Sequence, residues 1–249
     1  MICRAMVCRK ADYHDHDCML TLLSPECGRI DAIARGCKKP ISRLHAAAQL
    51  FVVGEYSFRE RNGYCSVVQC DILESFFSIA EDIRAFTVGE FVLQSSVDTA
   101  QPQQSANDLF RLAYYVLSYL GYGEGNPVDI CLYYMLHILQ IQGLRPATVT
   151  CALCGRSTFE KPTFHAEYGA LCYACSTERG EVKVDALTLE AMVRMMRLPL
   201  EELKRLVLPV PVREQMMDVL PPFFEKHMDH VYTAFSQLKK IEKMGKATL

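Results

Sequence analysis

The sequence contains no tryptophan, carries almost no net charge and has no long hydrophobic run. A formal net charge of −2 excludes a chain that is basic over its whole surface, so only local basic patches need to be considered. The longest apolar run, from Ile130 to Ile141, is shorter than the roughly 20 residues that span a bilayer, and it contains His137. The N-terminal segment 1–10 lacks the apolar core of a secretory signal. We therefore expect a soluble cytoplasmic protein without a membrane partner.

Motifs of the common catalytic sites are also missing. The sequence has no P-loop, no Gly-x-Gly-x-x-Gly, no His-Glu-x-x-His and no serine nucleophile elbow. Half of the residues are apolar, which is enough to build a hydrophobic core. We predict a folded protein that is not an enzyme.

Four cysteines form two Cys-x-x-Cys pairs. Cys151-Ala-Leu-Cys154 is followed, after seventeen residues, by Cys172-Tyr-Ala-Cys175. Two such pairs supply four thiolates to one tetrahedral Zn²⁺ in the spacing range of a zinc ribbon. Four protein ligands leave no open position on the ion, so the predicted zinc is structural. Two disulfides, or four inert thiols, are the alternative reading of the same cysteines.

Local sequence around these pairs predicts a zinc knuckle over residues 150–177. Gly155 stands where the first turn must reverse, because glycine tolerates the backbone angles of a tight turn. Aromatic and turn residues between the pairs predict a short hairpin over the metal: Phe159, Pro162, Phe164, Tyr168 and Gly169.

The other cysteines are scattered through apolar segments: Cys3, Cys8, Cys18, Cys27, Cys37, Cys65, Cys70 and Cys131. Without a secretory signal, scattered cysteines are typical of a reducing compartment. We expect them to act as small buried hydrophobic side chains.

Residues 1–76 show the alternation and β-branched content of strands. We expect five strands, near 2–10, 18–23, 29–35, 49–59 and 64–74. Asn62-Gly63 between the last two is a strong hairpin signal. Five short strands in this length predict a small closed barrel, and the OB-fold is the best candidate.

Residues 77–249 change to a helical pattern around the inserted knuckle. A polar gap at 98–107 is followed by Asn107-Asp108, which we expect to cap a helix. Further helices are expected at 128–142, 185–197, 200–206 and 212–236, with Pro199, Pro209, Pro211 and Pro221-Pro222 as breaks or first-turn residues. The predicted fold class is α+β, an OB-fold domain followed by a helical domain.

Positive charge gathers between Gly28 and His45. Five basic residues stand there against one acid, Asp31: Arg29, Arg35, Lys38, Lys39 and Arg43. On an OB barrel this stretch covers the third strand and the loop that leaves it, where such barrels bind single strands along a basic groove. A solvated basic loop without a ligand is the alternative.

Two other groups of residues are less informative. The nearby aromatic residues Phe51 and Phe58 are better explained as barrel core than as stacking platforms. His14-Asp15-His16-Asp17 reads as a turn, and His227 with His230 as a solvated helix surface, rather than as metal ligands.

The N-terminal segment resembles the RecO family of bacterial recombination mediators. The resemblance lies in Gly28-Arg-Ile-x-Ala-x-Ala-Arg35-Gly36, in Lys38-Lys39-Pro-x-Ser-Arg43 and in Ala48-Gln-Leu-Phe51, with Tyr13-His-Asp-His-Asp17 upstream. Leu73-Glu-Ser-Phe76 closing the barrel and four cysteines near residue 150 match in order. The resemblance extends over essentially the whole chain.

The resemblance implies a function and a set of partners. Such proteins bind single- and double-stranded DNA, anneal complementary strands, contact RecR and help to load recombinase, and they need no catalytic centre. Some members dock the C-terminal tail of single-strand-binding protein in the helical domain. Leu132-Tyr-Tyr-Met135 stands here where many members have a more polar stretch containing an arginine, which would help to hold this acidic tail. Arg111 is the candidate to replace that arginine. A bacterial, nucleoid-associated protein is implied.

A second hypothesis stays open beside DNA annealing. The barrel and the knuckle would then form a docking adaptor that binds proteins and has little DNA affinity of its own. Oligomeric state, the RecR contact and any preference for DNA sequence are not encoded in a recognisable pattern.

Overall fold

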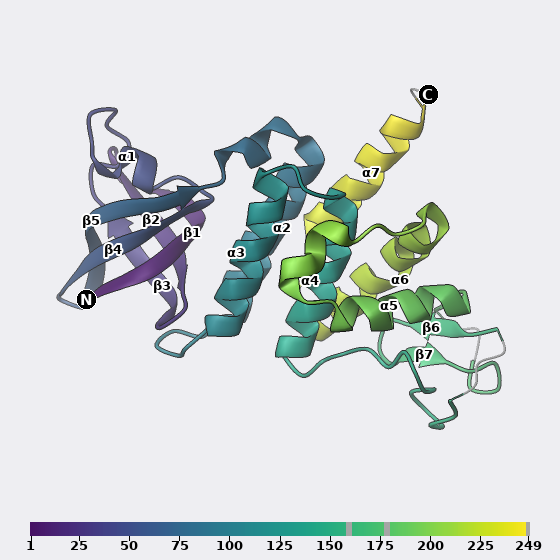
Figure 1. The fold of residues 1–249 in the computed structure, drawn as a ribbon. Helices are drawn as coiled ribbons and strands as arrows, with labels where there is room; N and C mark the ends of the chain where they lie inside the picture. The colour runs from purple at the N-terminus through teal and green to yellow at the C-terminus, as the bar shows by residue number, and fades with distance from the viewer. Residues whose placement is uncertain (158–160, 177–179, 248–249) are drawn as a thin grey trace. The chain divides into compact units, whose positions relative to one another are not determined.

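The computed structural model describes residues 1–157, 161–176 and 180–247, without the side chains of Lys243 and of residues 245–247. The chain forms two compact units, Met1–Gly123 and Glu124–Leu249 (Figure 1). The first unit holds the barrel, one short helix and two longer helices, and the second holds the remaining helices and the cysteine pairs. A domain boundary at residue 76 falls inside the first unit and stays a prediction.

The N-terminal strands form the predicted closed five-stranded barrel. Its strand order is β1-β2-β3-β5-β4, and β4 pairs with β1 to close it. Only the β3–β5 pairing is parallel, which is the arrangement of an OB-type barrel. The strands are β1 (Ile2–Tyr13), β2 (Asp17–Ser24), β3 (Gly28–Ala34), β4 (Val52–Arg61) and β5 (Tyr64–Ser75). The sequence-based prediction of the fold class is confirmed.

The hairpin between β4 and β5 confirms the Asn-Gly signal. Asn62 and Gly63 have φ angles of 52° and 76°, so both occupy the left-handed region that a type I′ turn requires. The strands pair directly from this turn, with Arg61 opposite Tyr64. The turn therefore sets the register of the two strands.

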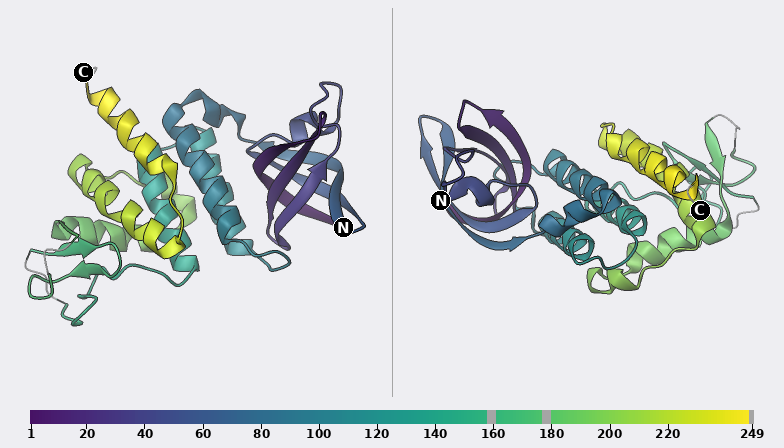
Figure 2. Two further views of the ribbon diagram at one scale, coloured as in Figure 1. Left: turned by 180° about the vertical axis from the view of Figure 1, so that it is seen from behind. Right: turned by 90° about the horizontal axis from the view of Figure 1, so that it is seen from above.

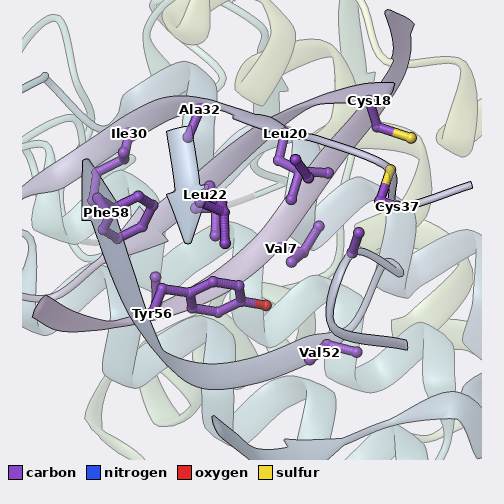
Figure 3. Packing of buried hydrophobic residues seen from close by; sticks show 14 of the residues in the cluster. Val7, Cys18, Leu20, Leu22, Ile30, Ala32, Cys37, Val52, Tyr56 and Phe58 are labelled. Carbon is purple, nitrogen blue, oxygen red and sulfur yellow. The ribbon is translucent and has the colours of Figure 1, made fainter. Parts of the chain in front are cut away.

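The barrel core is filled from alternate strand positions and from the short helix α1 (Leu44–Ala47) (Figure 3). Tyr56 is fully buried, stacks on Phe58 at 6.0 Å between ring centroids, and donates its hydroxyl to the Ala47 carbonyl oxygen at 2.6 Å. The hydroxyl thereby finds the partner that a buried phenol needs. Phe58, like Phe51, is a core residue, as the alternation indicated.

The scattered cysteines behave mostly as buried apolar side chains. Cys18 and Cys37 are fully buried and point toward each other at one end of the barrel core (Figure 3). Burial raises the pKa of Cys37 to about 12, and the thiol of Cys18 adds to this effect. Burial also raises the pKa values of Cys8 and Cys131 to about 12, so these thiols stay protonated and unreactive at neutral pH.

Two helices pack beside the barrel in the first unit. After the short 3₁₀ turn η1 (Phe77–Glu81), α2 (Ile83–Thr99) and α3 (Asn107–Gly121) lie side by side in both views of Figure 2. Asp82 caps α2 by accepting the amides of Arg84 at 2.7 Å and Ala85 at 3.2 Å. Gly89 of α2 lies against Phe51 of the barrel, where a Cβ atom would be crowded by the ring.

The expected cap of α3 is wrong. Its N-cap residue is Ala106, and no side chain caps this end, because the preceding segment is held by backbone contacts to the β2–β3 turn. The Arg29 amide donates to the Gln101 carbonyl at 3.3 Å, and the Gln103 amide to the Cys27 carbonyl at 2.9 Å. Gly28 is required here, since a Cβ atom would collide with carbonyl oxygens of Gln101 and Gln104.

The second unit combines helices with a small sheet. The helical elements are α4 (Pro127–Ile141), α5 (Ala186–Arg197), η2 (Leu200–Arg205), α6 (Val210–Met228) and α7 (Thr233–Ala247). The sheet has the order β7-β6-β8, from β6 (Thr163–His165), β7 (Gly169–Leu171) and β8 (Glu181–Lys183). Across the described part of the chain, no helix combines the length and the apolar character needed to cross a bilayer.

The expectation for residues 212–236 is wrong in two respects. Pro221 and Pro222 lie inside α6 instead of breaking it, because Leu220, Phe223 and Phe224 around them are buried and hold the helix in place. The break comes later, at Asp229, whose φ of 49° ends α6 in the left-handed conformation. Packing against the core overrides the local signal of the two prolines.

A buried ion pair stabilises the second unit. Asp129 in the first turn of α4 is fully buried and accepts bonds from Arg213 of α6 and from the Leu208 amide at 3.0 Å. The Arg213 guanidinium approaches it at 2.9 Å and is itself largely buried. The carboxylate therefore ties α4 to α6 and to the segment before it.

Replacing Asp129 by alanine should lower the free energy of unfolding by about 3–5 kcal/mol, because it leaves the Arg213 charge buried without its partner. Urea denaturation of the full chain measures the effect. The control is Asp218→Ala, which removes an exposed pair with Lys239 and should cost about 0–1 kcal/mol. Equal losses in the two variants would contradict the stabilising role of the buried pair.

Candidate metal centre and nucleic-acid surface

The four predicted cysteines converge on one point. The sulfur atoms of Cys151, Cys154, Cys172 and Cys175 all lie within 4.8 Å of one another. The Cys154 and Cys172 sulfurs are 3.7 Å apart. Sulfurs bound at about 2.3 Å to one Zn²⁺ stand roughly 3.8 Å apart along the edges of a tetrahedron. The donor set and its spacing fit a tetrahedral metal ion, and among the described residues this is the one group of three or more His, Cys, Asp and Glu side chains that does so.

Tight turns place each pair of sulfurs. The Gly155 amide donates to the Cys151 carbonyl at 2.9 Å, and Gly155 has a φ of 72°, which confirms its predicted role in reversing the chain. In the second pair the Cys175 amide donates to the Cys172 carbonyl at 2.9 Å. The Ala152 amide donates to the Ala170 carbonyl at 2.9 Å and joins the two turns. The geometry is therefore built by backbone contacts.

The sheet of the knuckle contains the predicted hairpin and one strand that was not predicted. Strands β6 and β7 pair from Thr163–Leu171 to His165–Gly169, and Cys172 follows β7 directly. Phe164 is buried and meets Phe223 of α6 edge to face at 5.7 Å. Phe159 and residue 177, which belonged to the predicted knuckle, lie outside the described residues. The strand β8 is only three residues long, and the alternation of Glu181, Val182 and Lys183 is too short to predict a strand.

The electrostatics of the four thiols favour a bound cation. Burial opposes ionisation of Cys151, but the backbone amides of Cys172, Cys154 and Leu153 outweigh it and lower its pKa to about 6. Side-chain hydrogen bonds with Cys154 and Cys172 raise the pKa of Cys175 to about 12. Four thiolates this close cannot all ionise without a positive charge between them, which a divalent ion supplies.

The basic stretch forms an ordered loop at one end of the barrel. It leaves β3 after Ala34 and reaches α1 at Leu44. The Gly36 amide donates to an Asp17 carboxylate oxygen at 2.7 Å, and the Lys38 amide to the His16 carbonyl at 3.1 Å. The loop is thus held against the β1–β2 turn, and its side chains project from a fixed backbone.

The five predicted basic residues divide into two kinds. Lys38 pairs with Asp12 at 3.0 Å and also donates to the His14 carbonyl at 3.2 Å, and Arg29 pairs with Asp31 at 3.0 Å. The pKa of Lys38 is raised, first by its hydrogen bond to Asp12. Arg35, Lys39 and Arg43 are exposed, and within the described residues they make no ion pair. These three side chains keep their full charge for a ligand.

Position separates Arg29 from the other four. It stands near the start of β3, whereas Arg35 follows the end of the same strand. Six residues of extended chain span roughly 20 Å. The structure brings Arg35, Lys38, Lys39 and Arg43 into one loop and leaves Arg29 at the opposite end of the strand.

The other sequence candidates lie in three different places: the core of the second unit, the β1–β2 turn and the surface of α3. Leu132, Tyr133, Tyr134 and Met135 are fully buried in α4, and the Tyr133 hydroxyl donates to the Leu198 carbonyl at 2.8 Å. They belong to the core of the second unit. His14–His16 form an exposed turn, as expected. Arg111 lies exposed on α3 with its guanidinium 5.9 Å from the centroid of the Tyr115 ring.

Changing Cys154 to serine should release the metal and unfold the knuckle, because binding of a structural ion is coupled to local folding. Metal content of the purified protein, with zinc expected at one equivalent per chain, measures the effect. Cys65→Ser in the barrel is the control and should leave the metal content unchanged. A wild-type protein without stoichiometric metal would contradict the assignment.

Comparison with known proteins gives the same family over most of the chain. The family models described as Recombination protein O N terminal and Recombination protein O C terminal match residues 1–76 and 80–233. DNA repair protein RecO of Alkaliphilus metalliredigens (strain QYMF) is 25% identical over 238 residues, which cover 94% of this chain and 97% of the relative. The protein of the same name in Bacillus mycoides (strain KBAB4) is 28% identical over 226 residues, covering 89% and 90%. That of Listeria monocytogenes serotype 4a (strain HCC23) is 30% identical over 173 residues, covering 70% and 68%. With its barrel, its helices and its paired cysteines in the expected order, this chain belongs to the RecO family of DNA repair proteins.

Proposed function

We propose that this protein binds and anneals single strands of DNA during recombinational repair and helps a RecR-type partner to load recombinase. It acts by binding and without a catalytic step. The observation that carries the proposal is the ordered loop with three uncompensated cations, Arg35, Lys39 and Arg43, on a barrel of the OB type. Barrels of this type commonly bind single strands through such basic grooves.

Charge on the loop suits a phosphate backbone. Binding to single strands gains free energy when cationic side chains replace condensed counterions, and base sequence does not enter. Arg35 and Arg43 offer guanidinium groups that fit phosphate oxygens in pairs. Lys38 contributes less, because it already holds Asp12 and would have to exchange that partner. Arg29 lies apart and serves at most as a distant contact along a longer strand or a duplex.

The cysteine site serves the fold in this proposal. Four thiolates select a soft or borderline ion, and tetrahedral S₄ coordination favours zinc. One Zn²⁺ would hold the turns at 151–154 and 172–175 together and take no part in DNA contact. The proposed division is a barrel domain at 1–76 and a helical domain at 77–249, and it is supported by family matches to residues 1–76 and 80–233.

The protein partners follow from family membership. A RecR-type protein and the C-terminal tail of single-strand-binding protein are the proposed partners, in a bacterial cytoplasm close to the nucleoid. Contact with the tail would have to use groups other than the side chains of Leu132–Met135, since these are buried. The competing function, a docking adaptor with little DNA affinity of its own, predicts the same protein partners and differs in the strength of DNA binding.

Reversing the three uncompensated charges, with Arg35→Glu, Lys39→Glu and Arg43→Glu combined, should abolish most single-strand affinity. The slope of log affinity against log salt concentration should become shallower by about 2, at roughly 0.7 for each phosphate contact. Fluorescence anisotropy with a labelled oligonucleotide measures both quantities. A matched triple reversal in the second unit, at Lys183, Lys204 and Lys226, changes net charge equally and should have little effect. If the loop variant binds single-stranded DNA as tightly as the wild-type protein, the loop is not the DNA-binding site.

Annealing separates the two candidate functions. We expect the wild-type protein to speed the pairing of complementary oligonucleotides, both with and without a RecR-type partner. Energy transfer between dyes on the two strands measures the rate. The loop variant should lose annealing activity but still bind the RecR-type partner. Absence of annealing by the wild-type protein under both conditions would favour the adaptor.

A further inference from the structure

The first unit contains a second polar and aromatic site that is separate from the basic loop. A pocket of about 480 Å³ opens between the outer face of the barrel and α3. Volumes of this size hold small ligands in many proteins. The barrel contributes Arg4 of β1, Val53 of β4, and Leu73 and Glu74 of β5, and α3 contributes Phe110, Arg111, Tyr114 and Tyr115.

Helix α3 presents a set of rings to this pocket. Phe110 and Tyr114 are one helical turn apart and lie nearly parallel, with 15° between planes and 6.3 Å between centroids. Tyr115 stands at 85° to Tyr114 and lies under the Arg111 guanidinium, 5.9 Å from its centroid. Phe110 is buried, whereas both tyrosines are partly exposed. The buried ring of Phe110 thus supports Tyr114, and both tyrosine rings stay partly accessible to a ligand.

Two cations stand at the pocket with one carboxylate. Arg4 is exposed on β1, and within the described residues it makes no hydrogen bond or ion pair. Burial and the charge of Glu74 raise the pKa of Tyr114, and Arg4 opposes this rise, so both charges lie near the phenol. Glu74 accepts the Tyr122 hydroxyl at 3.2 Å. Excess positive charge beside accessible rings is the combination that suits a nucleotide.

We infer that this pocket holds one nucleotide of a bound single strand, with the base against Tyr115 or Tyr114 and the phosphate between Arg4 and Arg111. The inference rests on the proposed single-strand binding and adds a contact that reads the flat face of a base, which the loop lacks. Glu74 supports it, because a carboxylate accepts hydrogen bonds from the amino groups of bases.

Photo-cross-linking tests the site directly. A single-stranded oligonucleotide that carries 5-iodouracil is bound to the full-length protein, irradiated, and the adducts are located by mass spectrometry. We expect adducts at Tyr114 or Tyr115. An acidic peptide added in excess should leave these adducts unchanged. If the peptide removes the adducts while the oligonucleotide stays bound to the protein, the pocket binds a peptide and the inference is wrong.

Variants of exposed residues provide the quantitative arm. Tyr115→Leu should weaken single-strand binding roughly five- to 150-fold, which is the range for losing one base–aromatic stack. Arg4→Glu and Arg111→Glu should each weaken binding and remove the cross-link, with circular dichroism confirming an unchanged fold. Lys204→Glu, an exposed reversal in the second unit, is the matched control.

The outcomes separate this inference from the proposed function. If Arg4→Glu and Arg111→Glu bind like wild type and the adducts lie only in residues 35–43, the pocket inference is wrong and the loop remains the DNA site. If the wild-type protein does not bind single strands, the inference and the proposed function both fail.

Discussion

The barrel is closed by β1, whose first part pairs with β4 and whose second part pairs with β2. Residues 2–6 of β1 pair with β4, and residues 6–13 pair with β2, with an irregularity between Val7 and Arg9 where the strand changes partner. A bulge of this kind bends a strand and increases its twist, which a small barrel needs in order to close. Each of the five strands pairs with a neighbour on both sides over part of its length, so none of them is a free edge strand. The position of both candidate DNA contacts follows from this strand, since Asp12 at its end holds the basic loop and Arg4 near its start lines the pocket.

The first unit keeps a local excess of positive charge although the chain as a whole is nearly neutral. The acidic side chains do not simply cancel the basic ones. Asp12 holds the loop through Lys38, and Asp17 holds it through the Gly36 amide. Neither carboxylate pairs with Arg35, Lys39 or Arg43, whose side chains are exposed. Surface pairs of this type contribute little to stability. Their effect here is to order the backbone from which the other cations project, which reduces the entropy lost when a ligand binds.

Features that depend on neighbours in sequence could be predicted from the sequence. Asn62-Gly63 determined its own turn, and two Cys-x-x-Cys pairs with Gly155 determined a metal-binding geometry, because only local backbone angles and spacing are involved. Features that depend on distant residues could not. The α3 cap was replaced by contacts to the β2–β3 turn, the prolines of α6 were overruled by packing, and the pairing of Lys38 with Asp12 joins residues 26 positions apart. The pocket beside α3 is formed where four elements meet, and no local pattern in the sequence indicates that these elements lie together.

The edge-to-face contact between Phe164 and Phe223 gives the cysteine site influence beyond its own turns. Phe164 lies on β6, whose hairpin partner leads into Cys172, and Phe223 lies in the middle of α6. An ion that binds only the folded knuckle stabilises it by mass action, by about 2.7 kcal/mol when its free concentration is one hundred times the dissociation constant. Through the ring contact, part of that free energy reaches a helix that carries two internal prolines. A metal ion held by the four cysteines would therefore make the folded fraction of the second unit depend on the concentration of free metal around the protein.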